Sequence, residues 1–176
     1  AVQPGHLLVQ SLSRAASTPL RNRITVGGSL GYIPPWSDLA PPLAALEASI
    51  HVMTPEGEHT LPFLEFLTNA SQLPAPRLVT AVTVPSGTGT AWYHRLVRTA
   101  FDYPRATMVI FMETDGTRVE RLRIAVGGTG KRLTLLDETA AGLEGHPLGT
   151  EPPAGLLESA ELDFPDKPQA SGLYLA

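Results

Sequence analysis

Hydrophobic positions along the chain follow two periods, one typical of helices and one typical of strands. In residues 6–16, Leu8, Leu12 and Ala16 fall on one helical face. Pro19 ends that helix, because the residue before a proline avoids the α region. Further short helices are predicted over residues 39–47, 62–69, 135–144 and 154–162, with Gly145 as the C-cap of the third.

Alternating apolar positions predict a set of strands. Ala48, Ile50 and Val52 alternate with polar or exposed positions, which is typical of a half-buried strand. Other strands are predicted over residues 78–84, 91–98, 106–113 and 118–126. The last two flank Thr114-Asp115-Gly116, a turn that predicts a hairpin. The pattern therefore indicates an α+β fold with mainly antiparallel sheets and short helices.

One segment is a candidate boundary between two small lobes. Residues 86–90, Ser-Gly-Thr-Gly-Thr, are small and polar and carry no apolar anchor. The segment divides the chain into a predicted first domain over residues 1–85 and a second over residues 91–176. Residues 20–29 of the first domain are interpreted as a loop or short strand that closes on a glycine pair.

Composition narrows the classes of function. The 176 residues include 16 Gly and 17 Pro, which favours turns over long helices. Acidic residues outnumber basic ones, 17 to 13, and the net charge of −4 argues against a surface that coats nucleic acid. There is no cysteine, so this sequence offers no disulfide, thiolate zinc site, cysteine-ligated iron–sulfur cluster or cysteine nucleophile.

Targeting signals are not evident in the sequence. No run approaches the roughly 20 apolar residues of a membrane helix, and the first residues lack the pattern of a signal peptide. We therefore expect a cytoplasmic protein without a membrane span. The sequence begins with Ala1, so either its start was processed or it belongs to a longer product.

Common catalytic and metal motifs are missing. The five histidines show no helical ligand spacing, and neither a GxSxG elbow nor a phosphate-binding Walker loop occurs. We expect no metal site and no catalytic residue in this chain.

A glycine pair is the strongest candidate for ligand binding. Gly27 and Gly28 bring backbone N–H groups close together, and such a concavity suits a pyrophosphate or a flavin edge because no Cβ holds the ligand away. Thr25 and Ser29 add hydroxyl groups. The alternative interpretation is a glycine-rich tight turn.

Asp38 has two interpretations as well. It can cap the helix over residues 39–47, although Pro41 has no N–H to donate to the cap. It can instead hold a ligand group such as a ribose hydroxyl.

Two stretches resemble a known flavoprotein motif. Residues 18–30, TPLRNRITVGGSL, and residues 37–46, SDLAPPLAAL, are similar to the second FAD motif of the molybdenum hydroxylase flavoproteins. These are the medium subunits of carbon monoxide dehydrogenase, xanthine dehydrogenase and related enzymes. The resemblance continues through residues 77–85, 92–103 and 121–128 and covers nearly the whole chain.

The resemblance implies FAD as the cofactor and assigns residues to it. The residues expected to bind FAD are Thr25, Val26, Gly27, Gly28, Ser29, Asp38, Val79 and His94. Thr25 through Ser29 would line the cofactor, Asp38 would bind the ribose region and Val79 would pack against a ring. Ser29 replaces the family's usual Asn, and His94 stands where a Lys is usual. The family's first FAD motif, in an N-terminal lobe, has no counterpart, so we expect a C-terminal portion with about half of the FAD site.

The implied function is electron transfer through a bound flavin in an oxidoreductase. In the family, electrons pass from a molybdenum cofactor through iron–sulfur clusters to FAD and then to an external acceptor. The expected partners are a molybdopterin-binding large subunit and a [2Fe-2S] small subunit, while this chain positions the flavin and is not catalytic alone. The alternative is a non-catalytic domain that docks onto partner subunits without FAD, with Trp36 as a candidate interface anchor.

Overall fold

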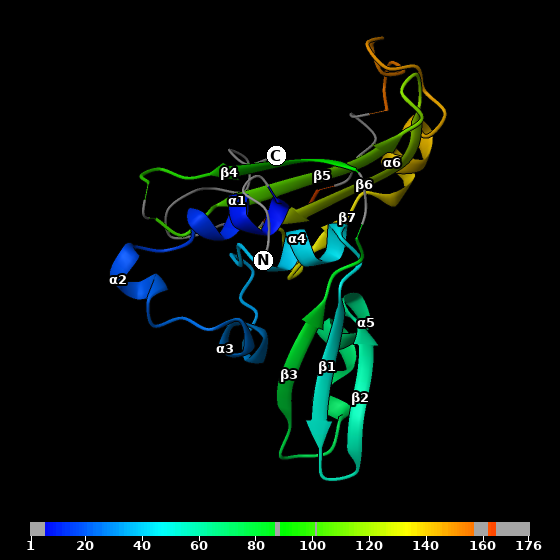
Figure 1. Cartoon of the computed structure of the whole chain (residues 1–176). Helices are drawn as coiled ribbons and strands as arrows, with labels where there is room; N and C mark the ends of the chain where they lie inside the picture. The colour runs from blue at the N-terminus through cyan, green and yellow to red at the C-terminus, as the bar shows by residue number, and fades with distance from the viewer. Residues whose placement is uncertain (1–5, 87–88, 101, 157–161, 165–176) are drawn as a thin grey trace.

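The computed structural model describes residues 6–86, 89–100, 102–156 and 162–164. Its elements form two antiparallel sheets with short helices between and around them (Figure 1). The helices are α1 (Leu7–Ser13), α2 (Thr18–Arg21), α3 (Val26–Gly31), α4 (Ala40–Ala45), α5 (Phe63–Asn69), the 3-10 turn η1 (Ala70–Gln72) and α6 (Asp137–Leu143). The strands are β1 (Ser49–Thr54), β2 (Gly57–Pro62), β3 (Leu78–Thr83), β4 (Thr90–Leu96), β5 (Ala106–Thr114), β6 (Val119–Gly127) and β7 (Thr134–Leu135).

The smaller sheet has the order β2-β1-β3, and β1 pairs antiparallel with both neighbours. Alternation along β1 buries Ile50 and Val52, which join Phe63 and Phe66 of α5 in one hydrophobic cluster. The Thr54 hydroxyl donates to the Gly57 carbonyl at 3.1 Å and closes the tight β1–β2 turn. This sheet forms the narrow lower part of Figure 1.

The larger sheet has the order β4-β5-β6-β7 and is antiparallel throughout. Its central hairpin turns at Asp115, whose Oδ1 accepts from the N–H groups of Thr117 and Arg118, both at 2.7 Å. These hydrogen bonds, that of Thr117 first, hold the pKa of the Asp115 carboxyl below its usual value. Helix α6 packs beside β6 in a second cluster with Leu122, and Gly145 follows the helix with a φ of 79°.

One hydrophobic core connects the two sheets. Helix α4 is buried along its whole length and packs against β5 and β6 of the larger sheet. The same core contains Leu43 of α4, Ile50 of β1 and Val109 of β5. Glu47, in the turn between α4 and β1, forms ion pairs with Arg121 and Arg123 of β6. These ion pairs connect the segment that leads into the smaller sheet to the larger sheet.

Most predicted elements are present, and the α+β architecture with antiparallel sheets is confirmed. The loop or strand predicted over residues 20–29 is wrong, because this segment forms the end of α2 and the start of α3. The predicted helix over residues 154–162 falls partly outside the described residues. The predicted division into domains 1–85 and 91–176 separates the two sheets along the chain and stays a prediction.

None of the described helices is long and apolar enough to cross a membrane. Within the same described ranges, no group of three or more histidine, aspartate and glutamate side chains is placed to hold a metal ion.

Candidate functional site

A cavity of about 860 Å³ opens between α3 and the smaller sheet. Its wall combines backbone of α3, apolar side chains of β1, β3 and α5, and two arginines. The lining residues are Gly27, Gly28, Leu30, Gly31, Tyr32, Ile33, Val52, Phe66, Leu67, Thr68, Ala70, Ser71, Arg77, Leu78, Val79 and Arg132. Its size is typical of cofactor sites, and its lining combines apolar side chains with a similar share of polar groups.

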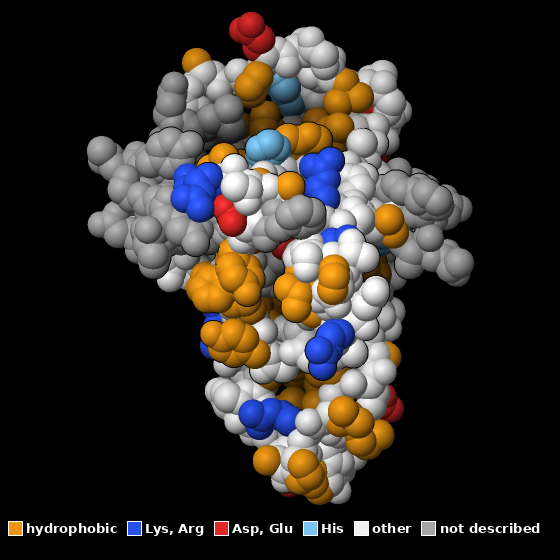
Figure 2. Space-filling model, turned by 90° about the vertical axis from the view of Figure 1, so that its left-hand side faces the viewer, with side chains coloured by type: hydrophobic (Ala, Val, Ile, Leu, Met, Phe, Trp, Pro, Cys, Tyr) orange, Lys and Arg blue, Asp and Glu red, His pale blue; other side chains and the backbone are white. Residues whose placement is uncertain are grey.

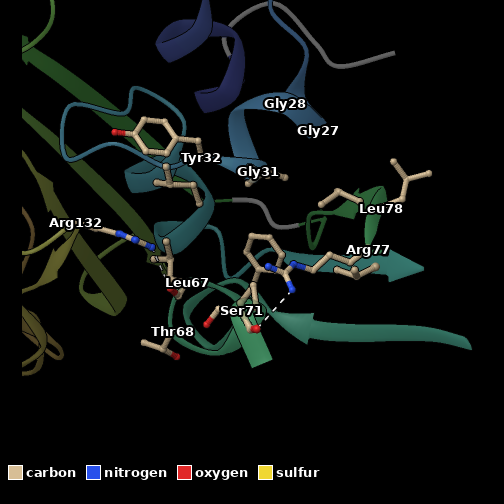
Figure 3. A pocket seen from close by; sticks show the side chains of 16 residues that line it. Gly27, Gly28, Gly31, Tyr32, Leu67, Thr68, Ser71, Arg77, Leu78 and Arg132 are labelled. Carbon is tan, nitrogen blue, oxygen red and sulfur yellow. Dashed lines mark hydrogen bonds between the residues drawn. The ribbon is translucent and has the colours of Figure 1, made fainter. Parts of the chain in front are cut away.

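The glycine pair lies on the wall of this cavity. Gly27, Gly28 and Gly31 belong to α3, and Figure 3 shows them on one side of the cavity with Tyr32 beside them. A Cβ on Gly27 would lie 3.9 Å from the Val79 carbonyl oxygen, between the helix and β3. A side chain at this position would therefore occupy the space between the two elements.

Thr25 sets the position of the glycine pair. It is the N-cap of α3, and its Oγ1 accepts from the Gly28 N–H at 3.0 Å. The Ser29 hydroxyl donates to the Thr25 carbonyl at 3.0 Å. Of the five residues predicted around this motif, only Gly27 and Gly28 line the cavity, while Thr25, Val26 and Ser29 complete the helix turn that presents them. Binding of FAD by these residues stays a prediction.

A second glycine pair, Gly127-Gly128, has a different role. The Gly128 N–H donates to the Pro35 carbonyl at 2.9 Å, and a Cβ on Gly128 would lie 2.3 Å from the Arg105 carbonyl. A Cβ on Gly127 would lie 2.5 Å from Thr107 Oγ1. These glycines allow the end of β6 to pack closely against its neighbours, whereas Gly27 and Gly28 line the cavity.

Val79 lines the cavity from β3, beside Leu78. Leu78 is 67 % exposed, so this strand offers an apolar surface at the cavity. The predicted contact between Val79 and a cofactor ring stays a prediction.

Asp38 lies outside the cavity lining, in a buried cluster with two residues of β4. Its Oδ1 accepts from the Tyr93 hydroxyl at 2.6 Å and from Arg95 Nε at 2.8 Å. The side chains of Arg95 and Asp38 are only 4 % and 9 % exposed. Burial, and then the Asp38 charge, raise the pKa of Tyr93, so its phenol stays protonated and donates.

The cap interpretation of Asp38 is wrong. The N-cap position of α4 is Leu39, and the N–H groups of Leu39 and Ala40 donate to Ser37 Oγ, both at 3.2 Å, rather than to Asp38. The expected contact between Asp38 and a ribose stays a prediction, but both of its carboxylate oxygens already have protein partners.

His94 also lies away from the cavity lining. It points to the face of β4 opposite Tyr93 and Arg95 and stacks on Trp92, with ring centroids 5.4 Å apart. Trp36 packs against Tyr103, with ring centroids 5.5 Å apart. The structure therefore brings Gly27, Gly28 and Val79 together and leaves His94 elsewhere.

Two cationic residues of the cavity were missed in the sequence. Arg77 precedes β3, and Arg132 lies in the connection between β6 and β7 of the larger sheet. Figure 3 shows them reaching toward the cavity from opposite sides. Figure 2 shows basic side chains spread over the face that carries α3, with few acidic ones and a hollow in its lower part. No local motif marks either arginine.

Comparison with known proteins identifies relatives of this arrangement. Residues 2–87 match the family described as FAD binding domain in molybdopterin dehydrogenase. The chain is 28 % identical over 138 residues to the nicotine 6-hydroxylase medium subunit of Paenarthrobacter nicotinovorans, which covers 77 % of this chain and 49 % of the relative. It is 30 % identical over 124 residues to the carbon monoxide dehydrogenase medium chain of Hydrogenophaga pseudoflava, covering 68 % of this chain and 43 % of the relative. The chain thus spans less than half the length of these two relatives.

Solved structures share the fold. Carbon monoxide dehydrogenase from Hydrogenophaga pseudoflava superposes with a TM-score of 0.84 at 22 % identity, covering 95 % of this chain and 60 % of the other. Quinoline 2-oxidoreductase from Pseudomonas putida 86 superposes with a TM-score of 0.82 at 20 % identity, covering 96 % and 60 %.

Proposed function

Through residues 2–87 the chain belongs to the FAD-binding domain family of molybdopterin dehydrogenase, and on this premise we propose that its cavity holds FAD. The observation that carries the proposal is that the glycines of α3 and Val79 of β3 border the same cavity of about 860 Å³. The chain would contribute one part of the cofactor site in a larger assembly.

The residues of the cavity fit this cofactor in shape. Gly27 leaves room that a side chain would fill, and Gly31 has no other atom within 4 Å of the position where a Cβ would be. Leu78, Val79 and Phe66 supply apolar surface, which suits a flat aromatic ring.

The polar groups of the cavity lining also match the polar groups of FAD. The Ser71 hydroxyl and the guanidinium groups of Arg77 and Arg132 offer hydrogen bonds to sugar and phosphate oxygens. The Thr68 hydroxyl donates to carbonyls of α5, so toward a ligand it can only accept. A cofactor that combines a flat ring, a sugar chain and a diphosphate therefore matches the donor set.

The chain's own contribution would be to bind and orient the cofactor. When bound, the flavin supplies the oxidation–reduction chemistry, and the protein supplies position and environment. The α3 backbone would exclude water from one side of the cofactor, and the apolar strand residues would do so from the other. This division of labour needs no general acid or base from this chain.

Because two relatives are medium subunits, we also propose that this chain works in an assembly with other subunits. Electrons would arrive from iron–sulfur clusters on a [2Fe-2S] small subunit, fed by a molybdopterin-binding large subunit, and would leave to an external acceptor. The absence of cysteine supports this division, since the sequence cannot itself ligate such a cluster through thiolates. The division into two domains and the cytoplasmic location also remain predictions.

The first test is uptake of FAD by the full chain. We expect the purified protein to carry flavin absorbance that is released on denaturation, or to quench the fluorescence of added FAD with saturable binding. A colourless protein that takes up no added FAD would overturn the proposal and would leave the subunit-docking alternative.

A size series at Gly27 tests the location of the site. Gly27→Leu should weaken FAD binding by about tenfold or more, because the side chain would enter the cavity between α3 and Val79. Gly27→Ala is the matched control, since its Cβ makes only an ordinary contact at 3.9 Å. Both variants should keep the stability of the parent or gain up to about 1 kcal/mol, because glycine disfavours a helix. Equal FAD affinity of Gly27→Leu and parent in a fluorescence titration would place the cofactor elsewhere.

A further inference from the structure

The segment that leads from α1 to α3 lies almost entirely in solvent. Figure 1 shows α2 projecting away from both sheets, between the other two helices. No residue of α2 is buried, and of residues 18–26 only Arg21 is not exposed. Leu20, Ile24 and Val26 are 54 %, 51 % and 45 % exposed. Apolar packing therefore does little to hold this segment in place, although it leads into the helix that borders the cavity.

The Arg21 side chain ties this segment to the end of α1. Its Nη1 donates to the carbonyls of Ala15 at 2.8 Å and of Ala16 at 2.6 Å, and its Nη2 donates to Thr18 Oγ1 at 3.0 Å. These hydrogen bonds are strong for their kind because the donor is charged. They end on a fixed support, since α1 packs against α4 and β4.

Backbone hydrogen bonds connect this support to the glycine helix. The N–H groups of Arg23 and Ile24 donate to the Leu20 carbonyl at 2.9 and 3.0 Å, so the turn of α2 continues to the residue before Thr25. Thr25 is the N-cap of α3 and accepts from the Gly28 N–H. The guanidinium is thus connected through one turn of backbone to the start of the helix whose glycines line the cavity.

We propose that Arg21 is a positioning residue that holds α3 at the wall of the cavity. Its effect on a cofactor rests on the proposed function, because Arg21 is not among the lining residues and would act through Gly27 and Gly28. A segment without apolar anchors adopts many positions, and ordering it on binding costs free energy. With the Arg21 hydrogen bonds in place, that ordering is complete before a ligand enters the cavity.

The test compares Arg21→Ala with Arg23→Ala in the full chain, with FAD as the probe. Arg23 is the matched control, because it lies in the same exposed segment, carries the same charge and takes part in none of the side-chain hydrogen bonds or ion pairs of the described residues. Arg21→Ala should weaken FAD binding roughly tenfold, whereas Arg23→Ala should change it by less than about twofold. Arg21→Lys should keep part of the affinity, since an ammonium group can still donate to a carbonyl.

Two further measurements separate positioning from folding. The melting temperature of Arg21→Ala should stay within about 2 °C of that of the parent, because α2 contributes no buried residue to the hydrophobic core. Amide hydrogen exchange of residues 18–31, measured without FAD, should become roughly tenfold faster in Arg21→Ala and stay unchanged in Arg23→Ala, because only the first variant frees the segment to open locally.

The outcomes distinguish this inference from the proposed function. Equal FAD affinity of Arg21→Ala and the parent would overturn the inference and leave FAD binding intact. Equal losses of affinity in the two alanine variants would overturn it as well, since charge alone would then explain them, and so would a loss accompanied by a large fall in melting temperature. If the parent binds no FAD, the proposed function fails. Faster exchange in Arg21→Ala alone would then still support the inference, and equal exchange rates in the parent and both variants would overturn it.

Discussion

Asp38→Ala is expected to lower the free energy of unfolding by about 3–5 kcal/mol, because it leaves the buried Arg95 guanidinium without its counter-charge. The same change removes the acceptor of the Tyr93 hydroxyl. The loss is large against the total of roughly 5–15 kcal/mol that stabilises a typical domain. Urea denaturation followed by circular dichroism measures it as a shift of the midpoint.

Two further variants show that the effect comes from the buried charge. Asp38→Ala combined with Arg95→Met should recover part of the stability, because no unpaired charge then remains in the core. Glu58→Ala removes a largely exposed carboxylate 3.9 Å from His51 and should change stability by no more than about 1 kcal/mol. A loss below about 1 kcal/mol for Asp38→Ala would contradict the importance of the pair.

Gly128→Ala is expected to destabilise the protein by about 2–5 kcal/mol, from backbone strain and from overpacking together. The residue has a φ of 87°, which an L side chain rarely adopts, and its Cβ would lie 2.3 Å from the Arg105 carbonyl oxygen. Because the neighbouring atoms are backbone, they cannot move aside cheaply. Thermal unfolding monitored by circular dichroism measures the change.

Gly116→Ala is the matched control for this position. Gly116 has a similar φ of 93°, but no atom lies within 4 Å of its Cβ position. The control should cost only the strain of the left-handed conformation, about 1–2 kcal/mol. Equal losses at the two glycines would show that the close approach to Arg105 has no energetic importance.

β1, β3, β4, β5 and β6 could be predicted because apolar positions alternate along each of them. β2 and β7 were missed, since β2 has Leu61 as its only large apolar residue apart from proline and β7 is two residues long. Ile50 and Val52 are buried at alternate positions of β1, and the hairpin between β5 and β6 turns at Asp115 as expected. Helix α3 could not be predicted, because Val26, Gly27 and Gly28 are poor helix formers and their conformation depends on the Thr25 cap.

The candidate site could be predicted only where a local pattern reveals it. The glycine pair stands out because the absence of side chains is itself the signal. The role of Asp38 could not be inferred, since its partner Arg95 is 57 residues further along the chain. Arg132 comes to the cavity from the other sheet, and nothing near it in the sequence indicates that position.

The shared core has a consequence for how this protein unfolds. Leu43 in α4, Ile50 in the smaller sheet and Val109 in the larger one belong to a single cluster, so opening either sheet exposes apolar surface of the other. The two sheets should therefore exchange their most protected amide protons at a common rate, as one cooperative unit. A mutation in the larger sheet that weakens this core would then loosen the cavity wall as well, although it touches no residue of the cavity.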